Sequence, residues 1–329
     1  MTAAPWLPER EVPPEEARQL IRACFPALAA TRVEHFGEGW DNVAYLIDDT
    51  YVFRFPRRQL GADLMATEIR VMPGVAGLLP LPTSAPAFIG RPSATYPWPF
   101  AGYRVLPGHP LYRASFGLDQ RHRAAVPLAR FLAALHAISA EQAASLGAGP
   151  DPLGRFDITR RTAKARESIA RLTELGLLGD AAPLFAILDR ALAEGMPAEW
   201  TPVLVHADLD TRHILVDDGG QITGIIDWGD VHVGHRAIDL ALAHAFLPPE
   251  AHGAFCHAYG SIDPMTWRLA RFRALCHQAV VAGYGHDIGD TLMMREALAS
   301  LAHIAVAAED RMDSGPPSDQ SGQMANRER

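Results

Sequence analysis

The chain has 329 residues and a net charge of −8 at pH 7, from 30 Lys and Arg against 38 Asp and Glu. This acidic balance argues against a nucleic-acid partner, which requires a clustered basic surface. No apolar run approaches the roughly 20 residues of a membrane span, and residues 1–10 lack the apolar core of a signal peptide. Hydrophobic residues make up 48% of the chain, enough for the core of two domains or of one two-lobed domain.

Cysteine is sparse and odd in number, with Cys24, Cys256 and Cys276 as the full set. Proteins that depend on disulfides carry cysteine at much higher density and in even numbers. We therefore expect reduced thiols and a cytoplasmic location. Nothing in the sequence indicates an obligate protein partner.

The N-terminal third alternates between helical and strand patterns. Residues 13–29 have acidic side chains in the first turn and an apolar stripe, which predicts a helix. A second helix is predicted at 62–72. Alternating apolar residues predict strands at 31–36, 43–47, 51–55, 85–89 and 100–106.

Beyond residue 108 the pattern is mainly helical. Three short strands are predicted at 203–205, 213–216 and 221–226. The polar residues 313–329 predict a disordered tail. The spacing of apolar residues predicts helices at 118–138, 158–177, 183–194, 238–246, 250–259, 264–284 and 289–309.

Residues 203–230 bring carboxylates and a histidine to the ends of these strands. Asp208 follows the first strand, His213 begins the second, and Asp227 follows the third. The Asp-Asp-Gly-Gly turn at 217–220 predicts a hairpin, which places its entry loop beside its exit. Carboxylates hold Mg²⁺ together with substrate phosphates, and a further carboxylate can accept a hydroxyl proton. The arrangement is typical of phosphoryl transfer.

This stretch resembles the aminoglycoside phosphotransferase family, antibiotic and small-molecule kinases with a protein-kinase-like fold. Protein kinases carry the catalytic loop H-R-D-L-x-x-x-x-N and the metal motif D-F-G. Here His-Ala-Asp-Leu spans 206–209, His213 stands in place of Asn, and Asp-Trp-Gly spans 227–229. The resemblance implies that Asp208 is the catalytic base. It also implies that Asp227 and His213 hold Mg²⁺ and that Asp239 braces the catalytic loop.

The resemblance extends to the residues expected to bind the phosphates. Arg54 stands mid-strand where protein kinases carry a lysine, and Glu68 stands where they carry its helix partner. Lys164 is the single lysine of the chain, so phosphate-binding cations must come from arginines. Arg keeps the charge and can bind phosphate or carboxylate through two parallel hydrogen bonds.

The remaining nucleotide contacts are also implied by the resemblance. Gly37 and Gly39 lie in a glycine loop that ends at Asn42 and resembles the loop that covers the nucleotide in this family. The adenine or guanine base is expected against residues 103–106, where it would hydrogen-bond backbone groups, with Tyr103 and Val105 as its contacts.

The resemblance implies an α+β, two-lobed protein-kinase-like fold, in which a small N-terminal lobe has an antiparallel sheet and one helix and the large C-terminal lobe is mainly helical. The nucleotide-binding lobe is expected at 1–107 and the catalytic and substrate lobe at 108–312. The implied activity is transfer of the γ-phosphate of ATP or GTP, with Mg²⁺ as cofactor, to a hydroxyl of a small molecule. An aminoglycoside-type antibiotic is the expected acceptor, which would give antibiotic resistance.

The acceptor class stays open between three candidates. A metabolite is one of them, and the other two differ in the lining they need. A macrolide needs an apolar lining, for which the candidates are Trp267, Phe272 and Tyr284. A cationic aminoglycoside needs an acidic pocket, for which the candidates are Asp230, Asp263, Asp287, Asp290 and Glu296.

Two other functional classes remain as alternatives. A metal-dependent hydrolase would use Zn²⁺ or Mn²⁺ at a cluster of His and Asp between 206 and 213, extended by Asp230, His232 and His235. A catalytically weak nucleotide-binding protein is the second, because Asp210 stands where many kinases carry a cation. The Gly-His-Arg at 234–236 is a further departure from the family pattern.

Overall fold

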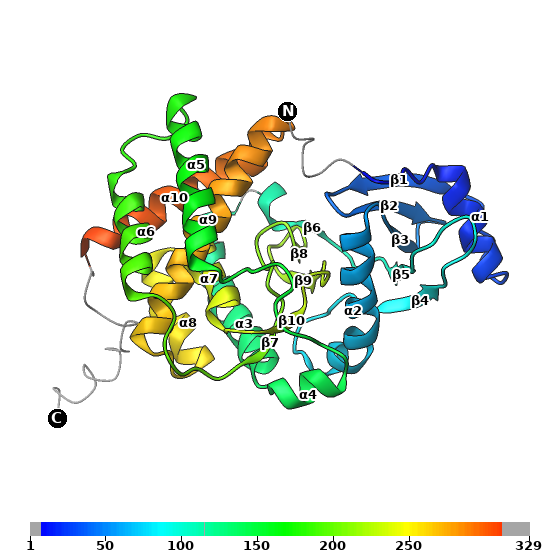
Figure 1. Ribbon diagram of the computed structural model, residues 1–329, viewed down its shortest axis with the longest axis horizontal. Coiled ribbons are helices and arrows are strands. Elements are labelled where there is room, and N and C mark those ends of the chain that lie inside the picture. Colours follow the sequence, from blue (N-terminus) through cyan, green and yellow to red (C-terminus); the bar gives the residue numbers. More distant parts are fainter. Residues whose placement is uncertain (1–7, 115, 311–329) are drawn as a thin grey trace.

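The structure is a computed structural model that describes residues 8–114 and 116–310. Figure 1 shows a strand-rich N-terminal region on one side and a larger, mainly helical region on the other. This arrangement confirms the predicted fold class, an antiparallel sheet followed by a mainly helical part. The tail predicted at 313–329 lies outside the described residues.

The N-terminal sheet has five antiparallel strands in the order β1-β2-β3-β5-β4. Asp48 and Asp49 both have positive φ and close the turn between the second and third strands, where two left-handed residues match the twist of a hairpin. All five strands were predicted, and no end differs by more than two residues. Their bounds are β1 Val33–Glu38, β2 Asn42–Ile47, β3 Tyr51–Pro56, β4 Pro86–Gly90 and β5 Phe100–Arg104.

Two helices cover this sheet, α1 Pro14–Cys24 and α2 Gln59–Val75, so the region has one helix more than the fold class named. Side chains of β3 alternate between the two faces. Phe53 and Phe55 are fully buried in the cluster that includes α1. Arg54 points to the other face and meets Glu68 of α2. This alternation is the one that the sequence predicted.

The C-terminal region is built around α9, which packs against α5, α6, α7 and α10 and contributes to one large apolar core. α4 was not predicted, because six residues are too few to show a helical period. Among the described helices, none combines the length and the apolar character needed to cross a membrane. The helices are α3 Leu118–His136, α4 Ala140–Ser145, α5 Ile158–Glu174, α6 Ala182–Glu194, α7 Ala237–Phe246, α8 His252–Tyr259, α9 Pro264–Asp287 and α10 Thr291–Asp310.

Two small sheets lie between these regions. One has the order β6-β8-β9, formed by His109–Pro110, Ile214–Val216 and Ile222–Ile225. The other pairs β7 Val203–Val205 with β10 His232–Gly234. The three predicted strands are therefore present, but the first pairs with the unpredicted β10 instead of with the hairpin. Because β7 and β10 are paired, the segments that leave and enter them run beside each other.

The passage between the two regions supports the predicted lobe boundary. β6 follows Gly108 directly and pairs with β8, so the chain has joined the sheet of β8 and β9 at that point. Gly108 has a φ of +102°, and a Cβ there would lie 2.5 Å from the Val216 carbonyl oxygen, so only glycine fits. We propose residue 107 as the end of the N-terminal lobe.

Five histidines have pKa values lowered by burial in the helical region. Burial lowers the pKa of His235 and His277 to about 4. Each of these rings is held in place: His235 packs against Trp200 with ring centroids 5.0 Å apart, and His277 contacts a buried carboxylate. The other three, also lowered mainly by burial, are His206, His232 and His244. The folded chain therefore holds uncharged imidazoles where an unfolded chain would hold titrating ones.

Lowering the pH from about 7.5 to about 5 is expected to destabilise the fold. Unfolded histidine titrates near 6.5, so between that value and about 4 the unfolded chain binds protons that His235 and His277 in the folded chain do not. The free energy of unfolding then falls as the pH falls, by on the order of 2 kcal/mol per residue at pH 5. Urea unfolding at the two pH values measures the loss.

A matched variant assigns this loss to histidine. His235→Asn does not titrate and keeps an acceptor for the Ala237 amide, which His235 Nδ1 accepts at 3.2 Å. We expect this variant to lose less stability than the wild type between the two pH values. An equal loss in both proteins would contradict the assignment.

Candidate active site

Two backbone segments form the floor of the site, residues 206–213 between β7 and β8 and residues 226–231 between β9 and β10. Each carries one non-glycine residue in the left-handed region, Ala207 with φ 70° and Asp227 with φ 64°. Such conformations are uncommon and occur where the surrounding structure enforces them, often in active sites. Ala207 lies next to Asp208, the predicted catalytic base, and Asp227 is a predicted Mg²⁺ ligand.

Asp239, on α7, holds the first of these segments. It is fully buried, and its Oδ1 and Oδ2 accept hydrogen bonds from the amides of Ala207 and His206 at 2.7 and 2.8 Å. Burial alone would raise the pKa of Asp239, but hydrogen bonds and charge from His136 outweigh it and lower the pKa. Its carboxylate thus stays ionised and fixes the loop backbone, the bracing position that the sequence predicted. His136 is a buried core residue in this network.

Asp208 lies at the centre of a ring of cationic and polar groups. Its Oδ1 is 3.6 Å from Arg155 Nη2, and its Oδ2 is 3.7 Å from both Arg212 Nη2 and His213 Nδ1. Burial alone would raise the pKa of Asp208, but the charges of Arg155 and Arg212 outweigh it and hold the pKa well below its usual range. The carboxylate is therefore ionised at neutral pH.

The other predicted residues form a row that leads from Asp208 to the N-terminal sheet. His213 Nε2 is 3.5 Å from Asp227 Oδ2, and Asp227 Oδ1 accepts a hydrogen bond from Arg54 Nη2 at 2.7 Å. Arg54 Nη1 donates to both oxygens of Glu68 at 3.2 Å. The structure thus brings all five residues together, although they come from both regions of the chain.

The charges in this row depend on each other. Burial raises the pKa of Glu68 by more than Arg54 lowers it, because its side chain is fully enclosed. Burial would also raise the pKa of Asp227, but Arg54 outweighs it and lowers the pKa. Arg54 is held charged by Asp227 and Glu68 against the cost of its burial. One guanidinium therefore keeps two carboxylates in place.

His213 and Asp227 fit a divalent cation. His213 Nδ1 lies 2.7 Å from the Asp208 carbonyl oxygen, which can only accept, so Nδ1 carries the proton. Its Nε2 then turns a lone pair toward Asp227. Mg²⁺ needs only one or two protein ligands besides phosphates and water, and it prefers carboxylate to imidazole. Asp227 would be the main ligand, with His213 beside it.

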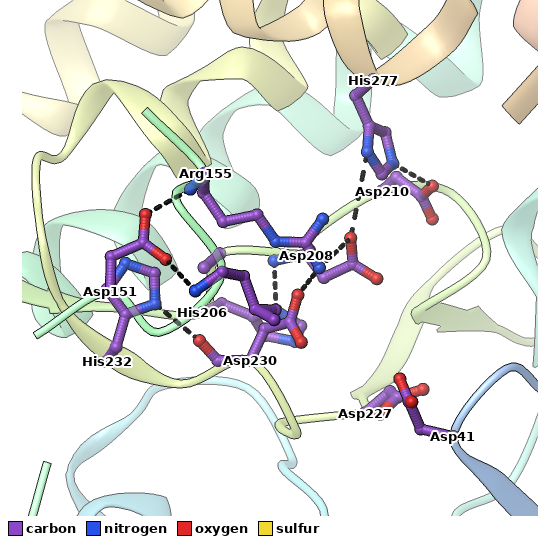
Figure 2. A network of polar contacts seen from close by, with 12 residues as sticks. Asp41, Asp151, Arg155, His206, Asp208, Asp210, Asp227, Asp230, His232 and His277 are labelled. Carbon is purple, nitrogen blue, oxygen red and sulfur yellow. Dashed lines mark hydrogen bonds and ion pairs between the residues drawn. The ribbon is translucent and has the colours of Figure 1, made fainter. Parts of the chain in front are cut away.

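Three residues near Asp208 have roles that the sequence did not indicate. Arg155 and His277 were not predicted as functional, and Asp210 was predicted to be unfavourable. Asp210 is buried and accepts from Arg212 Nε at 2.7 Å and from His277 Nε2 at 2.8 Å. Asp210 therefore holds the Arg212 guanidinium beside Asp208, although Asp210 itself is not a cation. Arg155 forms an ion pair with Asp230 as well as with Asp208 (Figure 2). Arg155 lies in a loop without a motif, so only the three-dimensional contact reveals it.

The predicted glycine loop reaches the helical region. The Gly39 amide donates to the Asn42 carbonyl at 2.9 Å, which closes the turn between β1 and β2. Trp40, at the tip, meets Tyr284 of α9 with ring centroids 5.6 Å apart, and Lys164 Nζ lies 5.9 Å from the Trp40 ring. Gly37 has open space around it. The loop therefore extends from the sheet across to α5 and α9.

The two residues predicted to contact the base have different positions. The Tyr103 ring is buried beneath Arg54, whose Cζ is 5.6 Å from the ring centroid, and its hydroxyl faces Met65. Tyr103 can therefore support Arg54, but its ring cannot stack on a base. The Val105 amide donates to the Thr50 carbonyl at 3.0 Å, so Val105 has only its own carbonyl to offer.

Most candidates for the acceptor lining are engaged elsewhere, and the acceptor class stays a prediction. Trp267 and Phe272 are buried in the helical core, because both sit on inward faces of α9. The five acidic candidates are each bonded to a neighbour. These pairs are Asp230 with Arg155, Asp263 with Arg236, Asp287 with Arg171, Asp290 with Tyr112 and Glu296 with Arg121.

Two of the histidines that a metal hydrolase would use contact backbone carbonyl oxygens through a ring nitrogen. His206 Nε2 contacts the Ile226 carbonyl at 3.1 Å, and His232 Nδ1 contacts the Asp230 carbonyl at 2.7 Å. Within residues 8–114 and 116–310, no three His, Cys, Asp or Glu side chains are placed to hold one metal ion. The site thus lacks the dedicated protein ligands of a zinc enzyme in its described part.

Comparisons with known proteins agree with this geometry. The GDP complex of a mutant of aminoglycoside 2'-phosphotransferase-IIIa is 25% identical, with a TM-score of 0.69, over 91% of this chain and 99% of that chain. The macrolide 2'-phosphotransferase MphH from Brachybacterium faecium is also 25% identical, with a TM-score of 0.55, over 86% and 97%. A curated relative, "Uncharacterized protein YcbJ" of Bacillus subtilis (strain 168), is 30% identical over 64 residues, which are 20% of this chain and only 21% of that protein.

A family model described as "Phosphotransferase enzyme family" matches residues 32–275. That match includes the N-terminal sheet, the catalytic loop and the first half of α9. The chain belongs to the phosphotransferase enzyme family, with the kinase-like fold of the aminoglycoside and macrolide phosphotransferases.

Proposed function

We propose that the protein is a kinase that transfers the γ-phosphoryl group of ATP or GTP to a hydroxyl of a small molecule. The observation that carries this proposal is the row from Asp208 through His213 and Asp227 to Arg54, with steps of 3.7, 3.5 and 2.7 Å. Phosphoryl transfer requires a hydroxyl-orienting carboxylate, a metal site and a phosphate-binding cation within one small volume. The row supplies all three.

Asp208 orients the acceptor hydroxyl by accepting its hydrogen bond. The new bond forms between the hydroxyl oxygen and the γ-phosphorus while the bond to the leaving diphosphate oxygen breaks. Because Arg155 and Arg212 hold the pKa of Asp208 low against burial, its carboxylate is a weak base. It receives the proton late, once the hydroxyl has lost electron density to phosphorus.

The opposite side of the site binds the phosphates. Asp227 and His213 would hold Mg²⁺, which neutralises phosphate charge when bound. Arg54 is fixed by Glu68 and bonds Asp227, so its guanidinium lies beside the proposed metal and phosphate site. Arg212, held by Asp210, adds a second cation near Asp208. This second cation answers the concern that Asp210 would weaken catalysis.

The donor and the first acceptors to test come from the relatives. A relative solved with GDP supports a purine nucleotide donor. The names of the relatives make aminoglycosides and macrolides the first candidate acceptors, and modification of either would give antibiotic resistance. All three cysteines are free thiols, which supports the predicted cytoplasmic location.

A direct assay tests the activity. The purified chain with Mg²⁺ is expected to release ADP or GDP faster when an acceptor from an aminoglycoside, macrolide and metabolite panel is present. The release is coupled to a spectroscopic readout for ATP and GTP separately. Failure to bind either nucleotide in the presence of Mg²⁺ would end the kinase interpretation. Turnover with Zn²⁺ or Mn²⁺ and no nucleotide would identify a hydrolase.

Asp208→Asn is expected to lower kcat by about 10²–10⁴-fold, because the amide cannot accept the hydroxyl proton. The dissociation constant of the nucleotide should stay within about threefold, since Asp208 lies on the acceptor side of the phosphates. Asp218→Asn, in the exposed turn between β8 and β9, is the matched control and should leave both values unchanged. Unchanged kcat in Asp208→Asn would favour the non-catalytic alternative.

Arg54→Gln is expected to lower kcat/KM for the nucleotide by about 10²-fold, and Arg54→Lys by less, because lysine keeps the charge but not the forked contact. The fork matters here because one guanidinium bonds Glu68 and Asp227 at once. Steady-state kinetics with varied nucleotide measures both variants. The same kcat/KM in all three proteins would remove Arg54 from the site.

A further inference from the structure

Four cationic side chains lie around Arg155, which contacts Asp208, and form what we call the basic cluster: Arg155, Arg161, Lys164 and Arg273. They come from three elements, the loop before α5, the first turns of α5, and α9. α5 and α9 pack against each other, and Cys276 Sγ of α9 donates to the Arg161 carbonyl at 3.8 Å. The cluster is therefore held by contacts between helices.

The cluster lies on the side of Asp208 that faces away from the phosphate-binding residues. Arg155 approaches Asp208 Oδ1, whereas His213 and Arg212 approach Oδ2. Figure 2 shows Arg155 and Asp227 on opposite sides of Asp208. In an in-line transfer the acceptor and the leaving group lie on opposite sides of the transferred phosphorus. The basic cluster is thus on the acceptor side.

Most of this positive charge is not compensated. Arg161 donates to the carbonyls of Leu153 and Gly154, at 2.8 and 2.9 Å, and not to a carboxylate. Arg273 is only 4% exposed, its Nη2 reaches just the Ala207 carbonyl at 3.4 Å, and its Nε has no hydrogen-bond partner among the described residues. A buried guanidinium with an unused donor is costly unless a ligand satisfies it.

The nearby carboxylates are already engaged. Asp208 and Asp230 share Arg155, and Asp151 accepts hydrogen bonds from the amides of Leu153 and Arg155. They do not form ion pairs with the other members of the basic cluster in the described part of the chain. The acceptor side of Asp208 therefore presents unpaired cations.

The pKa values of three members reflect the same crowding. Burial and repulsion from Arg155 lower the pKa of Arg161 and of Arg273 to about 10. Burial and the charge of Arg161 lower the pKa of Lys164. Each cation thus sits where further positive charge is unfavourable, and a bound anion would relieve all three.

We propose that the acceptor of this kinase carries an anionic group, a carboxylate or a phosphate, which the basic cluster binds while Asp208 orients the acceptor hydroxyl. Arg273 lines a small pocket with Asp208, His277 and Gln278, between the catalytic loop and α9. The proposal rests on the kinase function, because it assigns the acceptor of that same site. It favours a hydroxy acid over a polycation.

The charge pattern elsewhere points the same way. A polycationic sugar would need free carboxylates, and the five acidic candidates are bonded to neighbours, four of them to arginines. A cation placed among Arg161, Lys164 and Arg273 would meet repulsion at every approach. An anionic acceptor meets complementary charge there, which contributes both to its affinity and to its rate of association.

Three hexoses that differ in charge test the proposal: glucuronate, glucose and glucosamine. Titration calorimetry measures their binding to the full-length chain saturated with GDP and Mg²⁺. Glucuronate is expected to bind at least about tenfold more tightly than the other two, the effect of one charge-assisted hydrogen bond. Arg273→Gln should remove that preference. Lys164→Gln, at an exposed position that does not threaten folding, should reduce it by about threefold.

The control is Arg171→Gln, on α5 but in an ion pair with Asp287, which should keep the full preference. Glucosamine binding as tightly as glucuronate would overturn the proposal, and so would glucuronate that does not bind or is unaffected by both variants. Absence of GDP binding in the same samples would instead overturn the kinase function. The two failures are therefore distinguishable.

Discussion

The guanidinium of Arg54 is the link on which the site depends. It joins Glu68, fully buried on α2, to Asp227, which lies on the catalytic side of the molecule. Leaving one of these charges buried without its partner would cost several kcal/mol, so the three groups stabilise one another's positions. Arg54 in turn is placed by the sheet, where it lies between Ala44 and Ala101 on the neighbouring strands. Because these two neighbours are alanines, the guanidinium has room to reach Asp227 on the other side of the site.

The strain in the site is compensated within the site. Ala207 and Asp227 each adopt a left-handed backbone conformation that costs on the order of 1–3 kcal/mol for a residue with a side chain. Asp239 accepts the Ala207 amide, and Arg54 binds the Asp227 carboxylate. Hydrogen bonds to charged groups contribute about 1.5–3 kcal/mol each, which is of the same size. The catalytic loop and the Asp-Trp-Gly turn are thus held in shape by charges that also define the chemistry.

Sequence patterns predicted the features that depend on residues close together in the sequence. The five strands of the sheet and most helices follow from apolar spacing, and Asp208, His213 and Asp227 follow from motif spacing. Short elements were missed: α4 has six residues and β10 three, too few to show a period. The pairing of β7 with β10 was also missed, because strand partners depend on contacts distant in sequence.

The roles that were missed depend on direction and on partners. The sequence does not reveal the direction of the Tyr103 ring, which lies beneath Arg54, and the base contact expected from the Tyr103 backbone stays a prediction. The acidic candidates looked available in the sequence, because nothing local reveals the neighbour that each one meets. Nothing in the sequence distinguishes Arg155 and Arg273 from other arginines, because only the fold brings their loop and α9 to the catalytic loop. Asp210 likewise acts through Arg212 and His277, which no spacing rule connects.

The contact between Trp40 and Tyr284 joins the loop between β1 and β2 to α9, so it spans the two regions of the molecule. An edge-to-face aromatic pair contributes only about 0.5–1.5 kcal/mol. The Lys164 ammonium near the Trp40 ring adds a second contact, from α5. A tryptophan in this place therefore couples the position of the loop to two helices of the other region, through contacts that are individually weak.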